Sequence, residues 1–170
     1  MIADNWEIGH IAIAVENIEF AMASYSAALG VEWGTPIELA ETLVRSDVYP
    51  DGVQMAGVRE VMSCNGGNVL TNALQLVQAG PSPSSAAIWG CPDGRHYVHH
   101  IAYWVDDFEA ECDHLRSHGY VAETYFLDPT SVIDFVAPGG GPRFEIHDRD
   151  VKARLTKSWL PSGTTVSAST

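Results

Sequence analysis

The segment Ile8–Asn17, with the sequence IGHIAIAVEN, recurs later in the chain as Val98–Asp107, with the sequence VHHIAYWVDD. The two segments align without a gap, and both contain the tripeptide His-Ile-Ala. A glycine follows each segment at nearly the same distance, Gly30 in the first case and Gly119 in the second. A repeat of this length, followed by the same stop signal, indicates an internal duplication.

The first copy has the pattern of one strand, one helix and three further strands. Residues 8–15 are rich in β-forming side chains, and apolar residues then recur at spacings of three and four over residues 18–29, which is typical of a helix. Gly30 is suited to end this helix. Turn signals at Pro50-Asp51-Gly52 and Asn65-Gly66-Gly67 separate three further predicted strands, near 37–46, 54–63 and 69–78.

The second copy repeats this order. We predict a strand near 97–105 and a helix near 107–118, with Asp106 or Asp107 as its N-cap. Three strands follow, near 121–127, 131–137 and 143–148. The predicted fold class is therefore α+β, with two tandem βαβββ modules at residues 6–80 and 97–150, a linker at 81–96 and a polar C-terminal tail at 151–170.

Composition limits the classes of partner. A chain of 170 residues with 46% hydrophobic residues can fill the core of one compact domain. The net charge of −13, with only 9 lysines and arginines, argues against nucleic acid and anionic membranes as partners. No apolar stretch approaches the roughly 20 residues of a membrane span. Three cysteines without CxxC spacing, and no signal-peptide pattern, favour a cytoplasmic protein.

Strand alternation predicts which way each repeated histidine points. Side chains alternate between the two faces of a strand, so His10 and His100 fall on the face opposite the following helix, next to small alanines. His99 is the rival donor, but alternation places it with the helix-facing residues. Those helix-facing sets are Ile11, Ile13 and Val15 in the first copy and Ile101, Tyr103 and Val105 in the second.

The last strand of each copy carries one more candidate metal ligand. Gln75 and Glu145 are both oxygen donors flanked by apolar neighbours. A lone carboxylate on a half-buried strand is costly unless it is paired or coordinated. Two imidazoles, a carboxylate and an amide oxygen suit one divalent ion, with Zn, Co, Ni, Mn, Mg and Fe not distinguished. The alternative for each residue is an ordinary side chain at the sheet surface, bonded to solvent or backbone.

Three further residues are candidates for substrate binding. Arg143 and His147 share a strand face with Glu145. Arg143 could bind a substrate carboxylate or carbonyl, or form an ordinary salt bridge. His147 could contact the ligands or shuttle a proton, or be an exposed histidine. Trp104 could line a cavity or pack in the core.

At this point the chain resembles the vicinal-oxygen-chelate superfamily, which includes glyoxalases, bleomycin-resistance proteins and dioxygenases. The resemblance covers residues 6–150 and is carried by the two repeated segments, by the helix ends Leu29-Gly30-Val31 and His118-Gly119-Tyr120, and by Arg143-Phe144-Glu145-Ile146. It implies a cup-shaped mixed sheet with the helices outside, and a homodimer. It also implies one metal held by His10, Gln75, His100 and Glu145, a set most similar to that of the methylmalonyl-CoA epimerase family.

The expected function follows from that site. A bound divalent ion would stabilise the enolate or oxyanion of a small oxo substrate, as in an epimerase, isomerase or lyase. Glu145 is the expected base, and the resemblance implies a further glutamate from the middle strands, for which Glu41 is the candidate. The acidic chain lacks the basic patch that acyl-CoA phosphates would need. Alternatives are a ring-cleaving dioxygenase with non-haem iron, and a protein that sequesters small molecules without catalysis.

Overall fold

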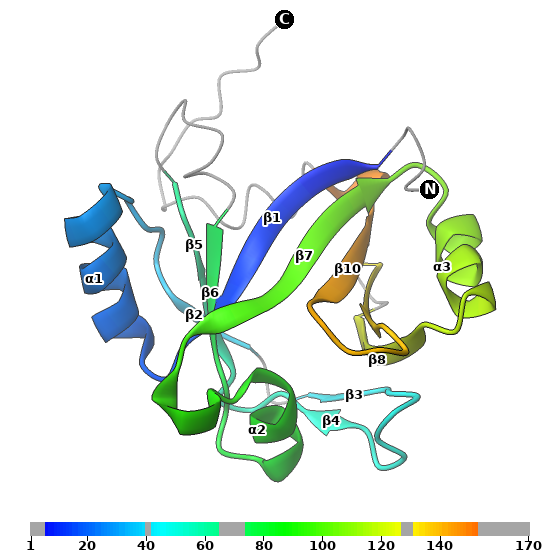
Figure 1. The fold of residues 1–170 in the computed structure, drawn as a ribbon, viewed down its shortest axis with the longest axis horizontal. Helices are drawn as coiled ribbons and strands as arrows, with labels where there is room; N and C mark the ends of the chain where they lie inside the picture. Colours follow the sequence, from blue (N-terminus) through cyan, green and yellow to red (C-terminus); the bar gives the residue numbers. More distant parts are fainter. Residues whose placement is uncertain (1–5, 40–41, 65–73, 127–130, 153–170) are drawn as a thin grey trace, which may run out of the picture.

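The computed structural model describes residues 6–39, 42–64, 74–126 and 131–152. Eight strands form one curled mixed sheet in the order β2-β5-β6-β1-β7-β10-β9-β8 (Figure 1). Their bounds are β1 Glu7–Ala14, β2 Ile37–Glu38, β5 Arg59–Met62, β6 Leu74–Gln78, β7 Tyr97–Val105, β8 Val121–Phe126, β9 Val132–Val136 and β10 Arg143–Asp148. The remaining elements are the hairpin β3 (Leu43–Val44) and β4 (Val53–Gln54), the helices α1 (Ile18–Leu29), α2 (Pro83–Trp89) and α3 (Phe108–Ser117), and short 3-10 turns at Pro92–Gly94 and Arg149–Val151.

The first strands of the two copies lie side by side at the centre of the sheet. β1 pairs antiparallel with β7, with His10 opposite Ala102 and Ala12 opposite His100. The last strand of each copy then adds in parallel, β6 beside β1 and β10 beside β7. The predicted α+β class and the duplicated strand order are confirmed. Because of this order, the four strands that carry the predicted ligands are neighbours.

Local sequence signals fix the two outer helices. Asn17 accepts a hydrogen bond from the backbone N–H of Phe20 at 2.8 Å and caps α1, and Gly30 ends that helix in the left-handed conformation with φ 67°. Asp107, rather than Asp106, caps α3 by accepting from the N–H of Ala110 at 3.1 Å. Both helices therefore begin and end within one residue of the predicted bounds.

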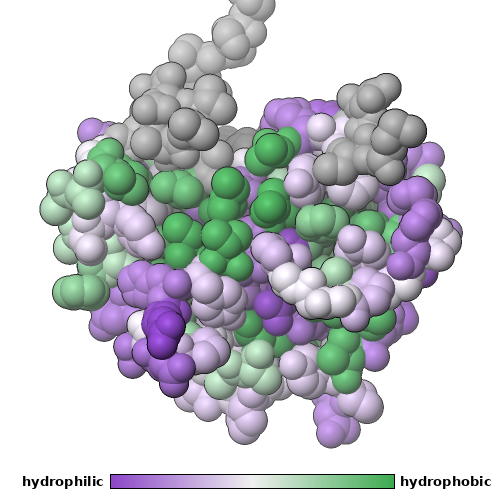
Figure 2. All heavy atoms as spheres, in the orientation of Figure 1, coloured by the Kyte–Doolittle hydropathy of each residue, from purple (hydrophilic) through white to green (hydrophobic). Residues whose placement is uncertain are grey.

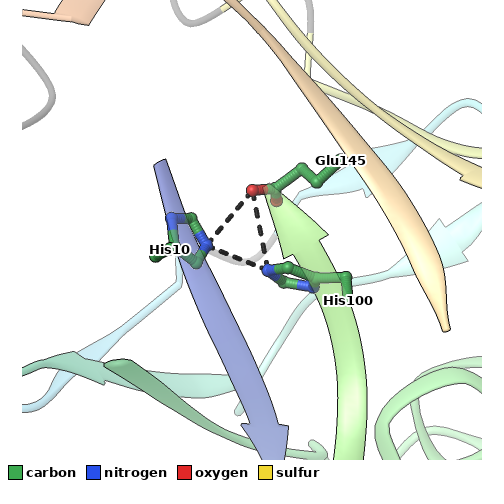
Figure 3. A group of neighbouring side chains, drawn as sticks. All are labelled: His10, His100 and Glu145. Atoms are coloured by element: carbon green, nitrogen blue, oxygen red, sulfur yellow. Dashed lines mark hydrogen bonds and ion pairs between the residues drawn. The ribbon is translucent and has the colours of Figure 1, made fainter. Parts of the chain in front are cut away.

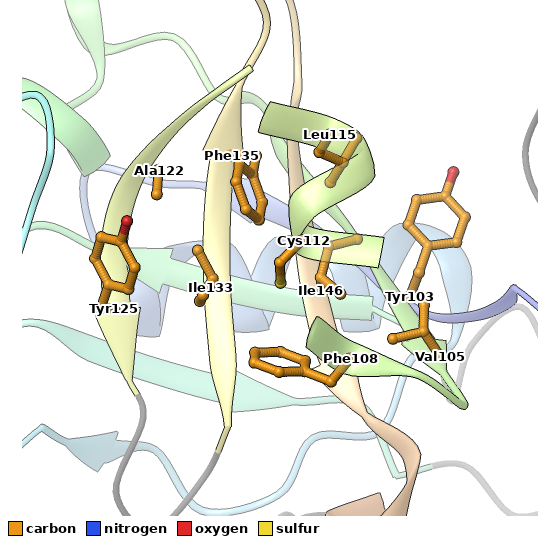
Figure 4. Packing of buried hydrophobic residues seen from close by; sticks show 10 residues of the cluster. All are labelled: Tyr103, Val105, Phe108, Cys112, Leu115, Ala122, Tyr125, Ile133, Phe135 and Ile146. Carbon is orange, nitrogen blue, oxygen red and sulfur yellow. The ribbon is translucent and has the colours of Figure 1, made fainter. Parts of the chain in front are cut away.

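All of the predicted helix-facing side chains except Ile11 lie in the two outer cores. Val15 packs with Ile18 and Ala21 of α1, and Ile13 lies against the same cluster. The second outer core lies between the sheet and α3 (Figure 4). It consists of Tyr103, Val105, Phe108, Cys112, Leu115, Ala122, Tyr125, Ile133, Phe135 and Ile146.

A third cluster fills part of the inner, concave face of the sheet. The β3–β4 hairpin and α2 pack there, as the lower part of Figure 1 shows. α2 lies within the predicted linker, and its start carries a recognisable signal, because Ser82 caps it and Pro83 occupies its first turn. The buried members of this cluster are Ala14, Val44, Val53, Met55, Val58, Val77, Ile88 and Trp89.

Two predicted strands are divided in the structure. The strand expected at 37–46 becomes β2 and β3, and that expected at 54–63 becomes β4 and β5. The second division has a physical cause, since Gly57 has φ 74° and takes the chain through a turn between β4 and β5. The strand predicted from residue 69 is described from Leu74 onward, and residues 153–170 of the predicted tail lie outside the described residues.

The surface seen in the orientation of Figure 1 is mixed in character. Apolar side chains gather near the middle of this face, over the central strands between α1 and α3 (Figure 2). Ile8 on β1 and Val98 on β7 are among the exposed large hydrophobic residues. Within the described ranges, no helix is long and apolar enough to cross a membrane.

The packing predicts unequal costs for two phenylalanine truncations. Phe135 is fully buried in the core under α3, whereas Phe20 on α1 is 70% exposed. Phe135→Ala should lower the free energy of unfolding by about 3–5 kcal/mol, because it removes apolar contact and leaves a cavity. Phe20→Ala should change it by less than about 0.5 kcal/mol. Urea denaturation of both variants measures the difference, and equal losses would contradict the packing described here.

Candidate metal centre

Two histidines and a glutamate meet on the inner face of the sheet. The Nε2 atoms of His10 and His100 lie 3.0 Å apart. The Oε2 atom of Glu145 lies 3.3 Å from Nε2 of His10 and 3.6 Å from Nε2 of His100 (Figure 3). All three residues are buried, and one ligand atom from each lies within 4.8 Å of the other two. The spacing suits a shared metal ion.

Strand register explains why these side chains meet. His10 on β1 faces Ala102 across the strand pair, and Ala12 faces His100. Each imidazole therefore has a small neighbour opposite it, which leaves room for the other ring. Glu145 on β10 lies beside Ala102 in parallel register and joins the pair from the other side of β7.

The electrostatics suit a cation. Burial lowers the pKa of His10 to about 3, and burial also lowers the pKa of His100. Both rings are thus neutral near pH 7 and keep a nitrogen lone pair for coordination. Burial raises the pKa of the Glu145 carboxyl, but its interactions with the imidazoles of His100 and His147, including a hydrogen bond to His147, outweigh burial and hold that pKa below its ordinary value. The centre therefore offers two neutral imidazoles and one carboxylate.

Gln75 reaches the same place from β6. It pairs in register with Ala12, its side chain is buried, and its Nε2 donates to Oε2 of Glu60 at 3.1 Å. With the amide nitrogen so engaged, the buried carbonyl oxygen Oε1 is left to face His10, whose pKa the contact with Gln75 raises against the larger effect of burial. This oxygen is thus placed beside the other donors. The four predicted ligands therefore fit a divalent ion that accepts nitrogen and oxygen donors.

A small cavity adjoins the centre. Its volume is about 40 Å³. Its polar lining consists of Glu60, Gln75, His100, Asp134 and Glu145, and its apolar lining of Leu39, Met55, Val58, Val77, Trp89 and Phe126. A reacting group that enters this space would lie against the metal ligands and among apolar side chains.

Two further carboxyls in this cavity escaped the sequence analysis. Removal from water, together with the charge of Glu145, raises the pKa of Glu60 to about 7. The same two causes raise the pKa of Asp134 well above its ordinary value. Asp134 is buried, and its Oδ2 accepts from Thr124 at 2.5 Å. The sequence signal that could have identified both residues is the one that identified Glu145, namely an acidic residue within an otherwise apolar strand.

The predicted strand face of His99 is wrong. Strand alternation placed it on the α3 side, but its ring lies on the inner face, 2.9 Å from His100 between the two Nδ1 atoms. The register between β1 and β7 shifts here, since Ala12 pairs with His100 and Ile13 with Val98, so that His99 is skipped. A bulge of this kind interrupts alternation and turns neighbouring side chains to one face.

The three residues predicted to bind substrate have partners within the protein. His147 is buried, its Nε2 contacts Oε2 of Glu145, and its ring lies 4.7 Å from the Trp104 ring. The possibility that His147 is exposed is therefore excluded. The Arg143 guanidinium forms a paired contact with the buried carboxyl of Glu123, and one of its two bonds is 3.1 Å long. Glu41 lies outside the described residues.

The protein thus has an α+β fold in which two repeated modules form one curled sheet, with possible metal ligands on the central strands. The chain belongs to the Glyoxalase/Bleomycin resistance protein/Dioxygenase superfamily, whose sequence model matches residues 9–141. No curated protein matches the chain.

Solved structures share this fold at low sequence identity. A methylmalonyl-CoA epimerase from Mycobacterium tuberculosis is 22% identical, with a TM-score of 0.50 over 83% of this chain and 86% of the other. A second methylmalonyl-CoA epimerase is 21% identical, with a TM-score of 0.54 over 83% and 93%. A hypothetical protein from Bacillus halodurans C-125 is 17% identical, with a TM-score of 0.57 over 85% and 95%.

The geometry predicts about one divalent ion per chain. His10→Ala and His100→Ala should each lower the affinity for Co²⁺ or Zn²⁺ by more than about 100-fold. Loss of a residue that only hydrogen-bonds to a ligand costs up to about 100-fold, and loss of a ligand itself should cost more. Competition with a chromogenic chelator measures the affinity. The control is His114→Ala on the exposed face of α3, which should bind metal like the unaltered protein. Full metal occupancy in both variants of the centre would refute the assignment.

Proposed function

We propose that the chain is a divalent-metal-dependent enzyme that stabilises the enolate or oxyanion of a small oxo substrate, of the epimerase, isomerase or lyase type. The observation that carries the proposal is the group of buried donors His10, His100 and Glu145 beside a small cavity that contains further carboxyls. Gln75 completes the proposed ligand set. Membership of a superfamily that includes metal-dependent enzymes supports the proposal.

The bound ion would act as a Lewis acid that polarises a carbonyl oxygen and stabilises the charge formed when a neighbouring C–H bond breaks. The protein residues supply the geometry. His10 and His100 present their Nε2 atoms to one point, and burial keeps both rings uncharged. The apolar part of the cavity lining would lower the local polarity, which would strengthen the interaction between the ion and the developing charge.

Two carboxyls are placed for proton transfer. Glu145 lies on β10 and Glu60 on β5, in opposite halves of the sheet, and both line the cavity. An epimerisation needs a base on one face of the reacting carbon and an acid on the other. We propose that Glu145 removes the proton and that Glu60 returns it to the opposite face. Glu41, the candidate from the sequence, stays a prediction.

The size and charge of the site favour a small substrate. The cavity of about 40 Å³ is smaller than the sites of about 300–1,000 Å³ that hold drug-sized ligands. The net charge of −13 also disfavours a substrate that carries several phosphates. We further propose a cytoplasmic homodimer, supported by three free cysteines and by the apolar side chains exposed on β1 and β7.

One observation favours a second function. Two histidines and one carboxylate are the ligand composition of non-haem ferrous oxygenases. His10, His100 and Glu145 have this composition, so a ring-cleaving dioxygenase is the alternative. The fourth donor, Gln75, favours the enolate chemistry, because it would occupy a position that an oxygenase keeps open. A sequestering protein would bind its ligand in the same cavity without turnover.

An exchange experiment tests the proposal directly. The metal-loaded protein should catalyse exchange of the α-proton of a small 2-oxo or 3-oxo compound in deuterated water, which proton NMR follows across a panel of such compounds. The metal-free protein should not, because the enolate then lacks its stabilising charge. Oxygen consumption with a ferrous-loaded sample would support the dioxygenase instead. Tight binding of a panel compound without exchange or oxygen uptake would support a sequestering protein.

A glutamate substitution tests the proton donor. Glu60→Gln should slow epimerisation of a chiral panel compound by about 100-fold or more, because general acid–base groups contribute about 10²- to 10⁴-fold. Exchange of the α-proton through Glu145 should persist. Metal content should stay unchanged, because the new amide keeps an oxygen that can accept from Nε2 of Gln75. The matched control is Glu38→Gln, an exposed residue on the neighbouring strand β2, which should leave both rates unaffected. Equal epimerisation rates for both variants and the unaltered protein would exclude Glu60 as the acid.

A further inference from the structure

His99 has no role in the ligand set, yet it is fully buried beside it. Its Nδ1 lies 2.9 Å from Nδ1 of His100, and its Nε2 lies 3.1 Å from the backbone oxygen of Ile88 in α2. The ring stacks on Trp89 with a centroid distance of 6.0 Å and an interplanar angle of 26°. His99 thus bridges a helix backbone and a proposed metal ligand.

The hydrogen-bond partners determine where the protons lie. A backbone carbonyl can only accept, so Nε2 of His99 must carry the proton of that bond. The described contacts of this buried ring are the Ile88 carbonyl, His100 and the aromatic rings of Trp89 and Tyr97, with no carboxylate among them, so the ring is neutral rather than a buried charge without a partner. A neutral ring with a proton on Nε2 has a lone pair on Nδ1, so His100 must donate its Nδ1–H to His99.

The consequence for His100 reaches the metal centre. Once Nδ1 of His100 carries the proton, its Nε2 atom presents a lone pair toward His10 and Glu145, which are 3.0 and 3.6 Å away. The opposite tautomer would place a proton on Nε2 and block coordination. The one other acceptor near Nδ1 of His100 in the described part of the chain is Oδ1 of Asp134, at 4.0 Å, which is too long for a hydrogen bond.

We propose that His99 is a positioning residue that selects the metal-binding tautomer of His100 and fixes its ring, with the Ile88 carbonyl of α2 as the anchor. This inference rests on the proposed function only in that it treats His100 as a metal donor. Residues that hydrogen-bond to a metal-ligating histidine orient its ring, and their substitution usually lowers metal affinity by about 10- to 100-fold. The proposal also assigns a role to α2, which supplies the anchoring carbonyl.

The first test needs no substitution. In the metal-free protein with ¹⁵N-labelled histidine, long-range proton–nitrogen NMR distinguishes a protonated ring nitrogen from a bare one. His100 should show a proton on Nδ1, and His99 should show a proton on Nε2. A proton on Nε2 of His100 would overturn the proposal whether or not the protein binds metal, and it would do so without affecting the test of enolate chemistry.

Two near-isosteric variants of His99 then test its two hydrogen bonds separately. An asparagine amide can place its oxygen where Nδ1 of histidine lies, whereas a glutamine amide reaches the position of Nε2. His99→Asn keeps an acceptor for His100 and should lower the affinity for Co²⁺ by less than about 10-fold, and His99→Gln loses that acceptor and should lower it by about 10- to 100-fold. Chelator competition measures both affinities.

A surface histidine provides the control for the glutamine substitution. His96→Gln alters an exposed residue three positions earlier and should leave Co²⁺ affinity unchanged. Circular dichroism and thermal unfolding establish that each variant is folded. Equal affinities for His99→Gln and the unaltered protein would overturn the proposal, as would an asparagine variant weaker than the glutamine variant. If the unaltered protein bound no metal at all, the proposed function would fail, and the NMR test would still decide the tautomer.

Discussion

The antiparallel pairing of β1 with β7 is the constraint on which the rest of the structure depends. It joins the two copies of the duplicated module and continues the sheet through all eight of its strands. It also sets each repeated histidine opposite a small alanine, which lets the two imidazoles approach to 3.0 Å. The pair of central strands is therefore both the structural seam of the fold and the origin of the candidate site.

The parts of the fold that local sequence determines could be predicted from it. The bounds of α1, β7 and β10 agree with the expected ranges, because apolar periodicity, an Asn17 cap and the αL glycine Gly30 act within a few residues. α2 and the β3–β4 hairpin were not predicted as such. Ser82 and Pro83 mark the start of α2, but the packing of this helix and the hairpin on each other and on the inner face of the sheet depends on contacts between residues distant in sequence.

The residues of the candidate site could also be predicted only in part from the sequence. The duplication brought out His10 and His100, and the repeated module ends brought out Gln75 and Glu145, which the structure gathers around one point. His99 was misplaced, because alternation assumes an unbroken register and the bulge between β1 and β7 breaks it. Glu60 and Asp134 depend on strand packing across the cup, where neighbours in space are far apart in sequence.

The cost of the polar interior bears on the proposed function. The carboxyls of Glu60, Asp134 and Glu145 line one small cavity, and burial together with the charge of Glu145 raises the pKa of the other two. Such a cluster destabilises a fold, because each buried acidic group must give up its charge or find a partner. Structural packing alone would be better served by apolar side chains of similar volume. A cation bound at Glu145 would make the electrostatic potential at this site positive. The carboxylates of Glu60 and Asp134 would then be attracted to the cation instead of being repelled by Glu145. The apolar wall from α2 and the hairpin then strengthens that attraction by keeping water out.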